Sequence, residues 1–160
     1  MDPLPACRKD VLVICCGNPL RGDDGAGWHA AGQLEHAADG GTDIITCRQL
    51  MPELSETISR AGLVIFVDAR QGETPGNIRI EPVFPSDMER GSFTHHFDPA
   101  LLLSYAEKLY GKKPEAYLAT VAGRSFDHEE KLSPETAAAM PALLEKIGGI
   151  IAQYRDKDHA

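Results

Sequence analysis

Residues 17–27 read GNPLRGDDGAG, and this stretch decides how the rest of the chain is organised. It follows a largely apolar run at residues 10–16 and precedes an alanine-rich segment with helical character. Glycines let the backbone turn sharply and lie close to other groups. The stretch therefore predicts a tight loop between a strand and a helix, with the carboxylates of Asp23 and Asp24 at the helix entrance. In open α/β sheets, functional sites lie at such loops, at the carboxyl ends of the strands.

The composition is that of an ordinary soluble globular protein. The 160 residues are 42% hydrophobic and 25% charged, which favours one domain with a substantial core. We expect a single domain over residues 1–160, with loose ends at residues 1–8 and 156–160. The formal net charge of -8 disfavours a nucleic acid or an anionic membrane as a partner, because both select a basic surface.

The cysteines and the amino-terminal residues favour a cytoplasmic location. Cys7, Cys15, Cys16 and Cys47 include no CxxC pair, and adjacent Cys15 and Cys16 should point to opposite faces of a strand. We therefore interpret the thiols as reduced and mainly structural. The first ten residues are polar and unlike a signal peptide, and no apolar run reaches transmembrane length.

Apolar runs and turn signals predict alternating strands and helices. We expect strands at residues 10–16, 43–47, 62–69, 78–83 and 116–121, and helices at residues 25–38, 52–60, 98–109 and from 133 onward. The link before residue 78 is too short for a helical crossover, so the strand there should run antiparallel to its neighbour, and Pro82 suits a sheet edge. The order βαβαββαβα predicts a three-layer α/β/α fold with a five-stranded, mostly parallel mixed sheet.

The last two helices carry apolar stripes that should pack on the core. One stripe comprises Leu102, Tyr105, Ala106 and Leu109, and the other comprises Met140, Leu143, Leu144, Ile147, Ile151 and Tyr154. Pro141 and the glycines at 148 and 149 weaken the final helix, so we expect a kink or a broken start.

Two aspartates at predicted strand ends are the first candidates for chemistry. For Asp24, capping the following helix is the simpler interpretation. Asp68 ends the most apolar strand, where a carboxylate is costly unless it is hydrogen-bonded, paired or metal-bound. Amide hydrogen bonds from the next loop would explain Asp68 as well as a metal would. Because βαβ winding often makes the first and third strands neighbours, the two acids can meet in one crevice and form a cation site.

A polar loop before residue 98 supplies a candidate nitrogen ligand. It contains His95 and His96, and the strand before it returns the chain toward the sheet. An imidazole together with two carboxylates suits zinc or nickel. An exposed histidine without a function is the simpler alternative, and spacing alone does not choose between the two histidines.

Other catalytic patterns are weak or missing in the sequence. The glycine-rich loop lacks the spacing and the lysine of a P-loop and is not a GxGxxG fingerprint, although an anion would fit the helix end. No GxSxG elbow occurs. Cys15 and Cys16 lie too deep in a strand to be convincing nucleophiles.

Five motifs in order resemble those of the maturation endopeptidases of nickel–iron hydrogenases. They are GNPLRGDDG at 17–25, QLMPEL at 49–54, VDA at 67–69, THH at 94–96 followed by two leucines at 101–102, and LSPE at 132–135. Each motif is modest alone, but together they span nearly the whole chain. Lys131 stands where the family commonly has a glycine, which is a loop variation.

This resemblance implies an activity and a site. Such enzymes cut a short C-terminal extension from the hydrogenase large subunit after nickel insertion, and the nickel belongs to the substrate. The family's metal-contacting positions correspond to Asp24, Asp68 and His95, which would also be the catalytic residues. His95 is preferred over His96 for its distance from the leucines at 101–102. Gly22 and Gly25 would shape the loop near the scissile bond.

We therefore expect a cytoplasmic endopeptidase whose partner is a hydrogenase large-subunit precursor and whose nickel comes with that precursor. Nickel would polarise the scissile carbonyl, activate water or only position the substrate, and the two aspartates are an alternative means of activating water. A second hypothesis is a nickel-binding chaperone or scaffold without proteolytic activity. A third is a small-molecule enzyme that binds phosphate in the glycine loop, against which stands the lack of basic residues there besides Arg21.

Overall fold

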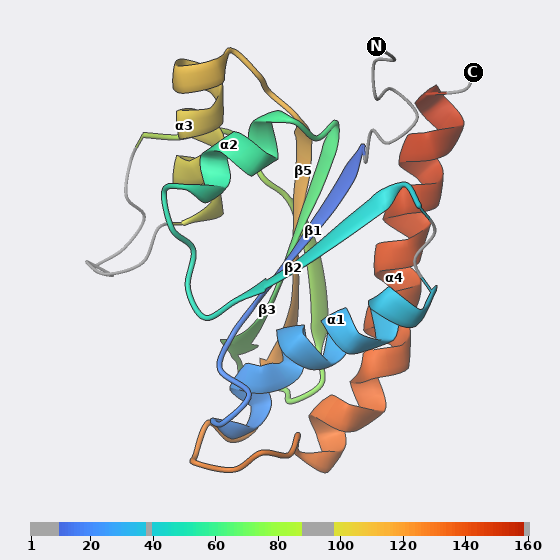
Figure 1. The fold of residues 1–160 in the computed structure, drawn as a ribbon. Coiled ribbons are helices and arrows are strands. Elements are labelled where there is room, and N and C mark those ends of the chain that lie inside the picture. The colour runs from blue at the N-terminus through green and yellow to red at the C-terminus, as the bar shows by residue number, and fades with distance from the viewer. Residues whose placement is uncertain (1–9, 38–39, 88–97, 159–160) are drawn as a thin grey trace.

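The structure is a computed structural model that describes residues 10–37, 40–87 and 98–158. In chain order its elements are β1 (Val11–Cys16), the short 3-10 helix η2 (Gly22–Gly25), α1 (Ala26–Ala37), β2 (Thr42–Cys47), α2 (Leu54–Ser59), β3 (Leu63–Gln71), β4 (Ile78–Pro82), α3 (Pro99–Tyr110), β5 (Glu115–Gly123) and α4 (Pro134–Asp158) (Figure 1). This order confirms the predicted one, with η2 as an addition. Within the described residues, no helix is both long and apolar enough to cross a membrane.

The five strands form one mixed sheet in the order β2-β1-β3-β5-β4. β1 pairs in parallel with β2 and β3, and β3 pairs in parallel with β5. β4 lies at the edge and is antiparallel to β5, as its short link and Pro82 indicated. The strand that precedes β4 in the chain, β3, is not its neighbour in the sheet, because β5 lies between them. The predicted fold class is confirmed.

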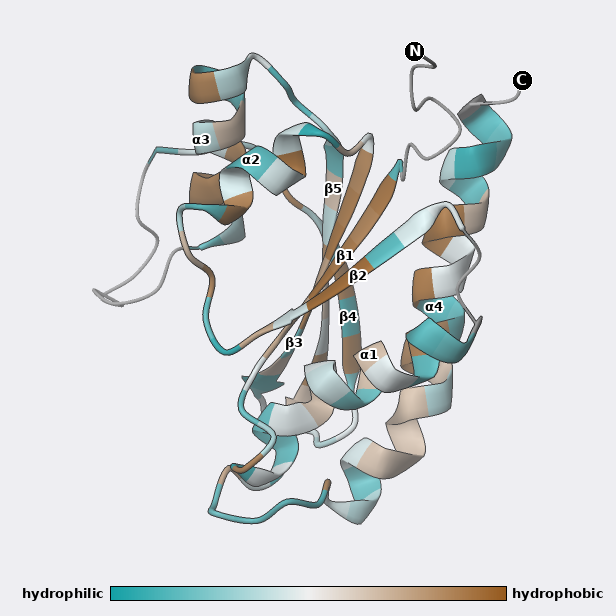
Figure 2. Ribbon diagram, in the orientation of Figure 1, coloured by the Kyte–Doolittle hydropathy of each residue, from teal (hydrophilic) through white to brown (hydrophobic). Residues whose placement is uncertain are grey.

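Helices cover both faces of the sheet (Figure 1). Because side chains alternate along a strand, Val13 and Ile65 belong to the core under α1 and α4, while Ile14 and Phe66 belong to the core under α2 and α3. The central strands are accordingly the most hydrophobic part of the molecule (Figure 2). The alternation continues to the end of β1, where Cys15 and Cys16 pack into opposite cores as predicted.

Helix α3 begins and ends as its sequence predicts, but its stripe stops early. The Asp98 carboxylate caps the helix by accepting a hydrogen bond from the Ala100 amide at 2.6 Å, and Gly111 ends it in the left-handed conformation. Leu102 and Ala106 are buried, whereas Leu109 is 67% exposed. The prediction for Leu109 is wrong because the packing of α3 on the core ends one turn earlier.

Helix α4 is continuous, so of the kink or broken start expected from Pro141 and the glycines at 148 and 149, the broken start is wrong. A proline lacks the N–H that would bond the carbonyl four residues before it, here that of Ala137. Pro141 and Ala137 are both exposed, so water can satisfy that carbonyl and the helix can continue. The predicted stripe of α4 is confirmed, with Leu143 and Ile147 fully buried. The helix also continues to Asp158, into the range where we expected a loose end.

Candidate active site

The loop between β1 and α1 folds back on itself at Gly17. This residue has a φ of 140°, a conformation that other residues rarely adopt. A Cβ atom at this position would lie 1.9 Å from the backbone oxygen of Asp24. The Asn18 amide donates to that same oxygen and to Oδ2 of Asp24, at 3.1 Å in each case. The first glycine of the motif therefore lets the chain cross Asp24 closely and hold its carboxylate in place.

Asp24 does not cap helix α1, which was the simpler interpretation of its position. Its carboxylate accepts a hydrogen bond from Asn18, behind it in the chain, and the turn of η2 separates it from α1. The side chain lies on the wall of a pocket. The physical reason is that η2 supplies the first turn ahead of α1, so the capping position predicted from a simple loop-to-helix junction does not arise.

Asp23, the adjacent acid, is buried and acts as an anchor for a distant loop. It accepts hydrogen bonds from the amides of Arg124, Ser125 and Ser133, at 2.6, 3.1 and 2.7 Å, and from the Ser133 hydroxyl at 2.7 Å. Burial raises the pKa of Asp23, but these hydrogen bonds outweigh it and hold the pKa below its ordinary value. Sequence reasoning missed this role because Ser133 lies 110 residues further along the chain.

Asp68 lies near the carboxyl end of β3, where the strand leaves the core. Its Oδ1 accepts a hydrogen bond from the Ala69 amide at 2.8 Å, so the amide explanation holds in part. The pKa of Asp68 is nevertheless raised to about 7: burial is the main cause, the amide counteracts it only partly, and the charge of Asp24 contributes to the rise. One amide therefore does not compensate the ionised carboxylate, and near neutral pH Asp68 is poised between its two protonation states.

Asp24 and Asp68 share one pocket of about 880 Å³ at the carboxyl ends of the central strands. They come together because β1 and β3 are adjacent and parallel, with Cys15 beside Val67 in register. Asn18 and Arg48 line the same pocket from the two loops that follow β1 and β2. Both acids thus line one pocket, as the winding of the first and third strands indicated, and their role in binding a cation stays a prediction.

His95 and His96, the candidates for the third ligand, lie outside the described residues. The chain that follows them reaches the site, because Asp98 and Pro99 at the start of α3 line the same pocket. Within the part of the chain that the structure describes, no three His, Cys, Asp or Glu side chains are grouped to hold a metal. The described residues thus bring together two of the three predicted ligands.

The two carboxylates fit a divalent cation chemically. Burial raises the cost of ionising Asp68, and the charge of Asp24 adds to that cost. A cation between them would favour the ionised forms of both, and carboxylate oxygens are common ligands for such ions. The arrangement can therefore bind a metal-bearing group, and without a cation Asp68 is only partly ionised near neutral pH.

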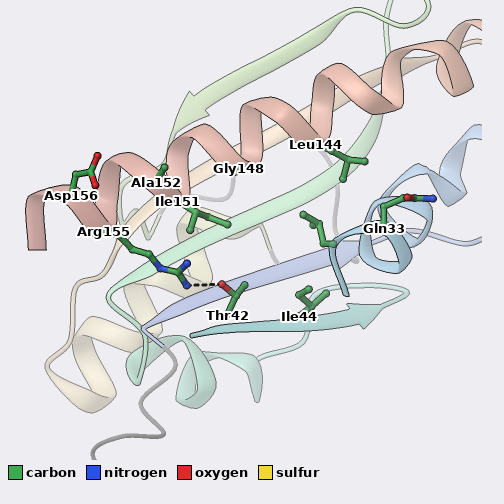
Figure 3. Close-up of a pocket in the computed structure, with 10 residues that line it drawn as sticks. Gln33, Thr42, Ile44, Leu144, Gly148, Ile151, Ala152, Arg155 and Asp156 are labelled. Carbon is green, nitrogen blue, oxygen red and sulfur yellow. Dashed lines mark hydrogen bonds between the residues drawn. The ribbon is translucent and has the colours of Figure 1, made fainter. Parts of the chain in front are cut away.

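A second hollow of about 620 Å³ lies between α1, β2 and α4 (Figure 3). Its wall is largely apolar, with Leu144 and Ile151 from α4 facing Ile44 from β2. At one end the Arg155 guanidinium donates a hydrogen bond to the Thr42 hydroxyl at 2.8 Å. Neither Asp24 nor Asp68 lines this hollow, so the candidate chemistry belongs to the other pocket.

Several known proteins with a similar sequence or fold are named hydrogenase maturation proteases. A relative from Methanocaldococcus jannaschii that bears this name is 31% identical over 157 residues, covering 90% of this chain and 97% of the relative. The hydrogenase maturating endopeptidase HybD from E. coli has a TM-score of 0.73 at 22% identity, covering 90% of this chain and 93% of its own. The maturation protease HycI from Thermococcus kodakarensis has a TM-score of 0.73 at 23% identity, with the same coverage. At these identities the two structures show the fold alone. No protein-family model matches this chain.

Proposed function

This chain belongs to the hydrogenase maturation proteases, and we propose that it removes the C-terminal extension of a nickel–iron hydrogenase large subunit after nickel insertion. Its membership makes it a peptide hydrolase, on the strength of the M. jannaschii relative that it matches over nearly the full length of both chains. One observation carries the finer proposal: Asp24 and Asp68 meet in one pocket at the ends of adjacent parallel strands.

In this proposal Asp24, Asp68 and His95 recognise the nickel that the substrate brings. The two carboxylates supply anionic oxygen ligands, and an imidazole nitrogen is a common ligand for nickel. A precursor without nickel leaves the acids facing each other uncompensated, with the pKa of Asp68 raised to about 7. A precursor with nickel relieves that repulsion. This difference gives a physical reason for the protease to act only after nickel insertion.

Asp68 has two conceivable roles, which make different demands on it. As a ligand it must stay ionised while the substrate is bound, whereas as a general base it must be free to take a proton from water. The pKa of Asp68 is raised chiefly by burial, which disfavours the ionised carboxylate. A bound cation would stabilise that ionised form directly, so we assign Asp68 the ligand role. Asp24, which is held by Asn18, faces the same pocket as the second carboxylate.

The test compares two forms of one substrate. The purified large-subunit precursor is incubated with this protein, with and without nickel in its active site, and the intact mass of the precursor is followed over time. We expect loss of the C-terminal extension only from the nickel-loaded form. Equal cleavage of both forms would refute nickel recognition. Nickel transfer or retention with no cleavage of either form would favour the chaperone or scaffold.

The same assay separates the two histidines. We expect His95→Ala to abolish cleavage of the nickel-loaded precursor and His96→Ala to leave it largely intact. The opposite result would move the ligand assignment to His96 and leave the two aspartates in their roles. Equal activity of both variants would remove histidine from the site.

A further inference from the structure

Two cysteines face each other at the edge of the candidate active-site pocket. Cys16 and Cys47 are the last residues of β1 and β2 and are partners in the parallel register. Their Sγ atoms lie 3.1 Å apart, and both are free thiols. Neighbouring strands lie roughly 4.8 Å apart, which falls within the range of Cα separations that disulfides span. Closing the bond needs a movement of about 1 Å between the sulfurs, well within the reach of side-chain rotation.

The backbone keeps this pair together. The carbonyl oxygen of Cys47 accepts hydrogen bonds from the Gly17 amide and from Nε1 of Trp28, both at 3.1 Å. Gly17 directly follows Cys16, so these bonds fasten the end of β2 to the loop that leaves β1. The backbone therefore keeps the two cysteines next to each other, whichever rotamers their side chains adopt.

The two thiols differ in a way that suits a stepwise exchange. Cys47 is partly exposed, whereas Cys16 is only 7% exposed and lines the pocket. The hydrogen bond between them lowers the pKa of Cys47 and raises that of Cys16, with burial raising both. Cys47 is thus the accessible thiol with the greater thiolate character, which is the form that attacks disulfides.

Cys15 provides an internal contrast. It is fully buried in the opposite core, and burial raises its pKa to about 12. A reagent in water reaches Cys47 first, and Cys15 on the other face of β1 is in no position to resolve an adduct there. Of the two adjacent cysteines of β1, only Cys16 is therefore placed to form a disulfide with Cys47.

We propose that Cys16 and Cys47 are a redox-active thiol pair that forms a reversible disulfide at the pocket edge on exposure to a small-molecule disulfide such as oxidised glutathione. The Cys47 thiolate attacks one sulfur of the reagent, forming a mixed disulfide and releasing the first glutathione thiolate. Cys16 then gives up its proton to solvent and displaces the second glutathione from Cys47. In total, two protein thiols are oxidised to one disulfide and one reagent disulfide is reduced to two thiols.

This pair has a structural consequence for the pocket. The disulfide would replace a hydrogen bond with a covalent link between the ends of β1 and β2 and draw the Cys16 sulfur toward β2. Because Cys16 precedes the loop that carries Asp24, the link would hold this edge of the site. This thiol chemistry does not depend on the proposed protease function.

The test is peptide mapping of the folded, full-length protein. After incubation with oxidised glutathione, free thiols are alkylated and the protein is digested with trypsin without reductant. Cleavage after Lys9, Arg21 and Arg48 places Cys15 and Cys16 in the peptide of residues 10–21 and Cys47 in the peptide of residues 22–48. We expect these two peptides to appear joined, lighter by two hydrogens than their sum, and to separate after reduction. Fragmentation should assign the bond to Cys16.

Serine variants provide the controls. Cys15→Ser should keep the link, and Cys16→Ser should lose it and leave glutathione on Cys47. Wild-type protein that stays unlinked, with or without glutathione on Cys47, would overturn the proposal. So would a link that persists in Cys16→Ser through Cys15. The wild-type fragmentation pattern decides the matter even for a variant that folds poorly.

Discussion

At the scale of single residues, Asp68 has an environment unlike that of an ordinary surface acid. It combines burial, one amide donor and a second carboxylate in the same pocket. The sequence alone singled out Asp68 because an acid at the end of a very apolar strand needs a compensating partner. It could not show that the compensation would be incomplete, because that depends on how deeply the strand end is covered.

We predict that Asp68 makes the free energy of unfolding fall as pH rises toward 7. Between the ordinary value of 3.8 and about 7, the folded state keeps a proton on Asp68 that the unfolded state has lost. The stabilisation is therefore complete below 3.8 and lost as pH rises through 7. Relative to pH 4, Asp68→Asn, which cannot ionise, should therefore gain up to about 4 kcal/mol of stability over wild type at pH 8.

Urea unfolding at a series of pH values measures this difference. Glu73→Gln, an exposed acid in the loop after β3, serves as the matched control and should follow wild type. Parallel pH profiles for wild type and Asp68→Asn would show that the carboxylate is not destabilised by its surroundings.

Asp23 illustrates a residue whose role the sequence could not reveal. We predict that Asp23→Ala destabilises the protein by about 2–4 kcal/mol, because it leaves three amides and a hydroxyl without their buried acceptor. The contribution of Asp23 should be present above the ordinary aspartate pKa and lost as pH falls through the lowered one. Denaturant midpoints measure the effect, and Glu130→Ala, an exposed acid of the same loop, should change little. A similar small change in both variants would deny Asp23 its anchoring role.

At the scale of elements, local signals were sufficient for most of the fold. Asp98 and Gly111 marked the two ends of α3, and the alternation along β1 predicted that Cys15 and Cys16 point to opposite faces of the sheet. The errors arose where tertiary packing decided the outcome. Leu109 has the right helical position but is exposed, and at the exposed Pro141 water can replace the missing hydrogen bond.

Helix α1 offers a matched test of how closely it packs on the sheet. A Cβ at Gly27 would lie 2.4 Å from the Cys16 carbonyl oxygen and 3.0 Å from that of Val67, whereas one at Gly32 would meet nothing within 4 Å. We predict that Gly27→Ala destabilises the protein by about 2–4 kcal/mol, because the helix must move away from β1 and β3. Gly32→Ala should be neutral or stabilising by up to about 1 kcal/mol. Thermal unfolding of both variants measures the difference. Equal changes in melting temperature would mean that α1 does not pack closely on β1 and β3 at Gly27.

At the scale of the whole molecule, the sheet order explains why distant residues form one site. The order β2-β1-β3-β5-β4 places β1 and β3 side by side at the centre, so residues 44 positions apart in sequence, Asp24 and Asp68, reach one pocket. Winding rules allowed that prediction, since they constrain which parallel strands become neighbours. They gave no sign of the contact between Asp23 and the loop before α4, because no local pattern records a pairing across the whole chain.

The adjacent residues Asp23 and Asp24 have different roles in the molecule. Asp23 ties the glycine loop to the loop before α4 and so stabilises the frame, while Asp24, one residue later, faces the pocket. A single motif thus contributes both to the fold and to the proposed recognition of nickel. The same loop begins at Gly17, which directly follows Cys16 and donates a hydrogen bond to Cys47, so the cysteine pair lies at the start of this loop.

The most direct test of the proposed site is the intact mass of a nickel-loaded large-subunit precursor after incubation with wild-type protein, Asp68→Asn or Glu73→Gln. We predict that wild type and Glu73→Gln remove the C-terminal extension, and that Asp68→Asn slows its removal at least about 100-fold while remaining folded. Removal of the extension by Asp68→Asn at the wild-type rate would contradict the assignment of the paired acids as the site that recognises nickel.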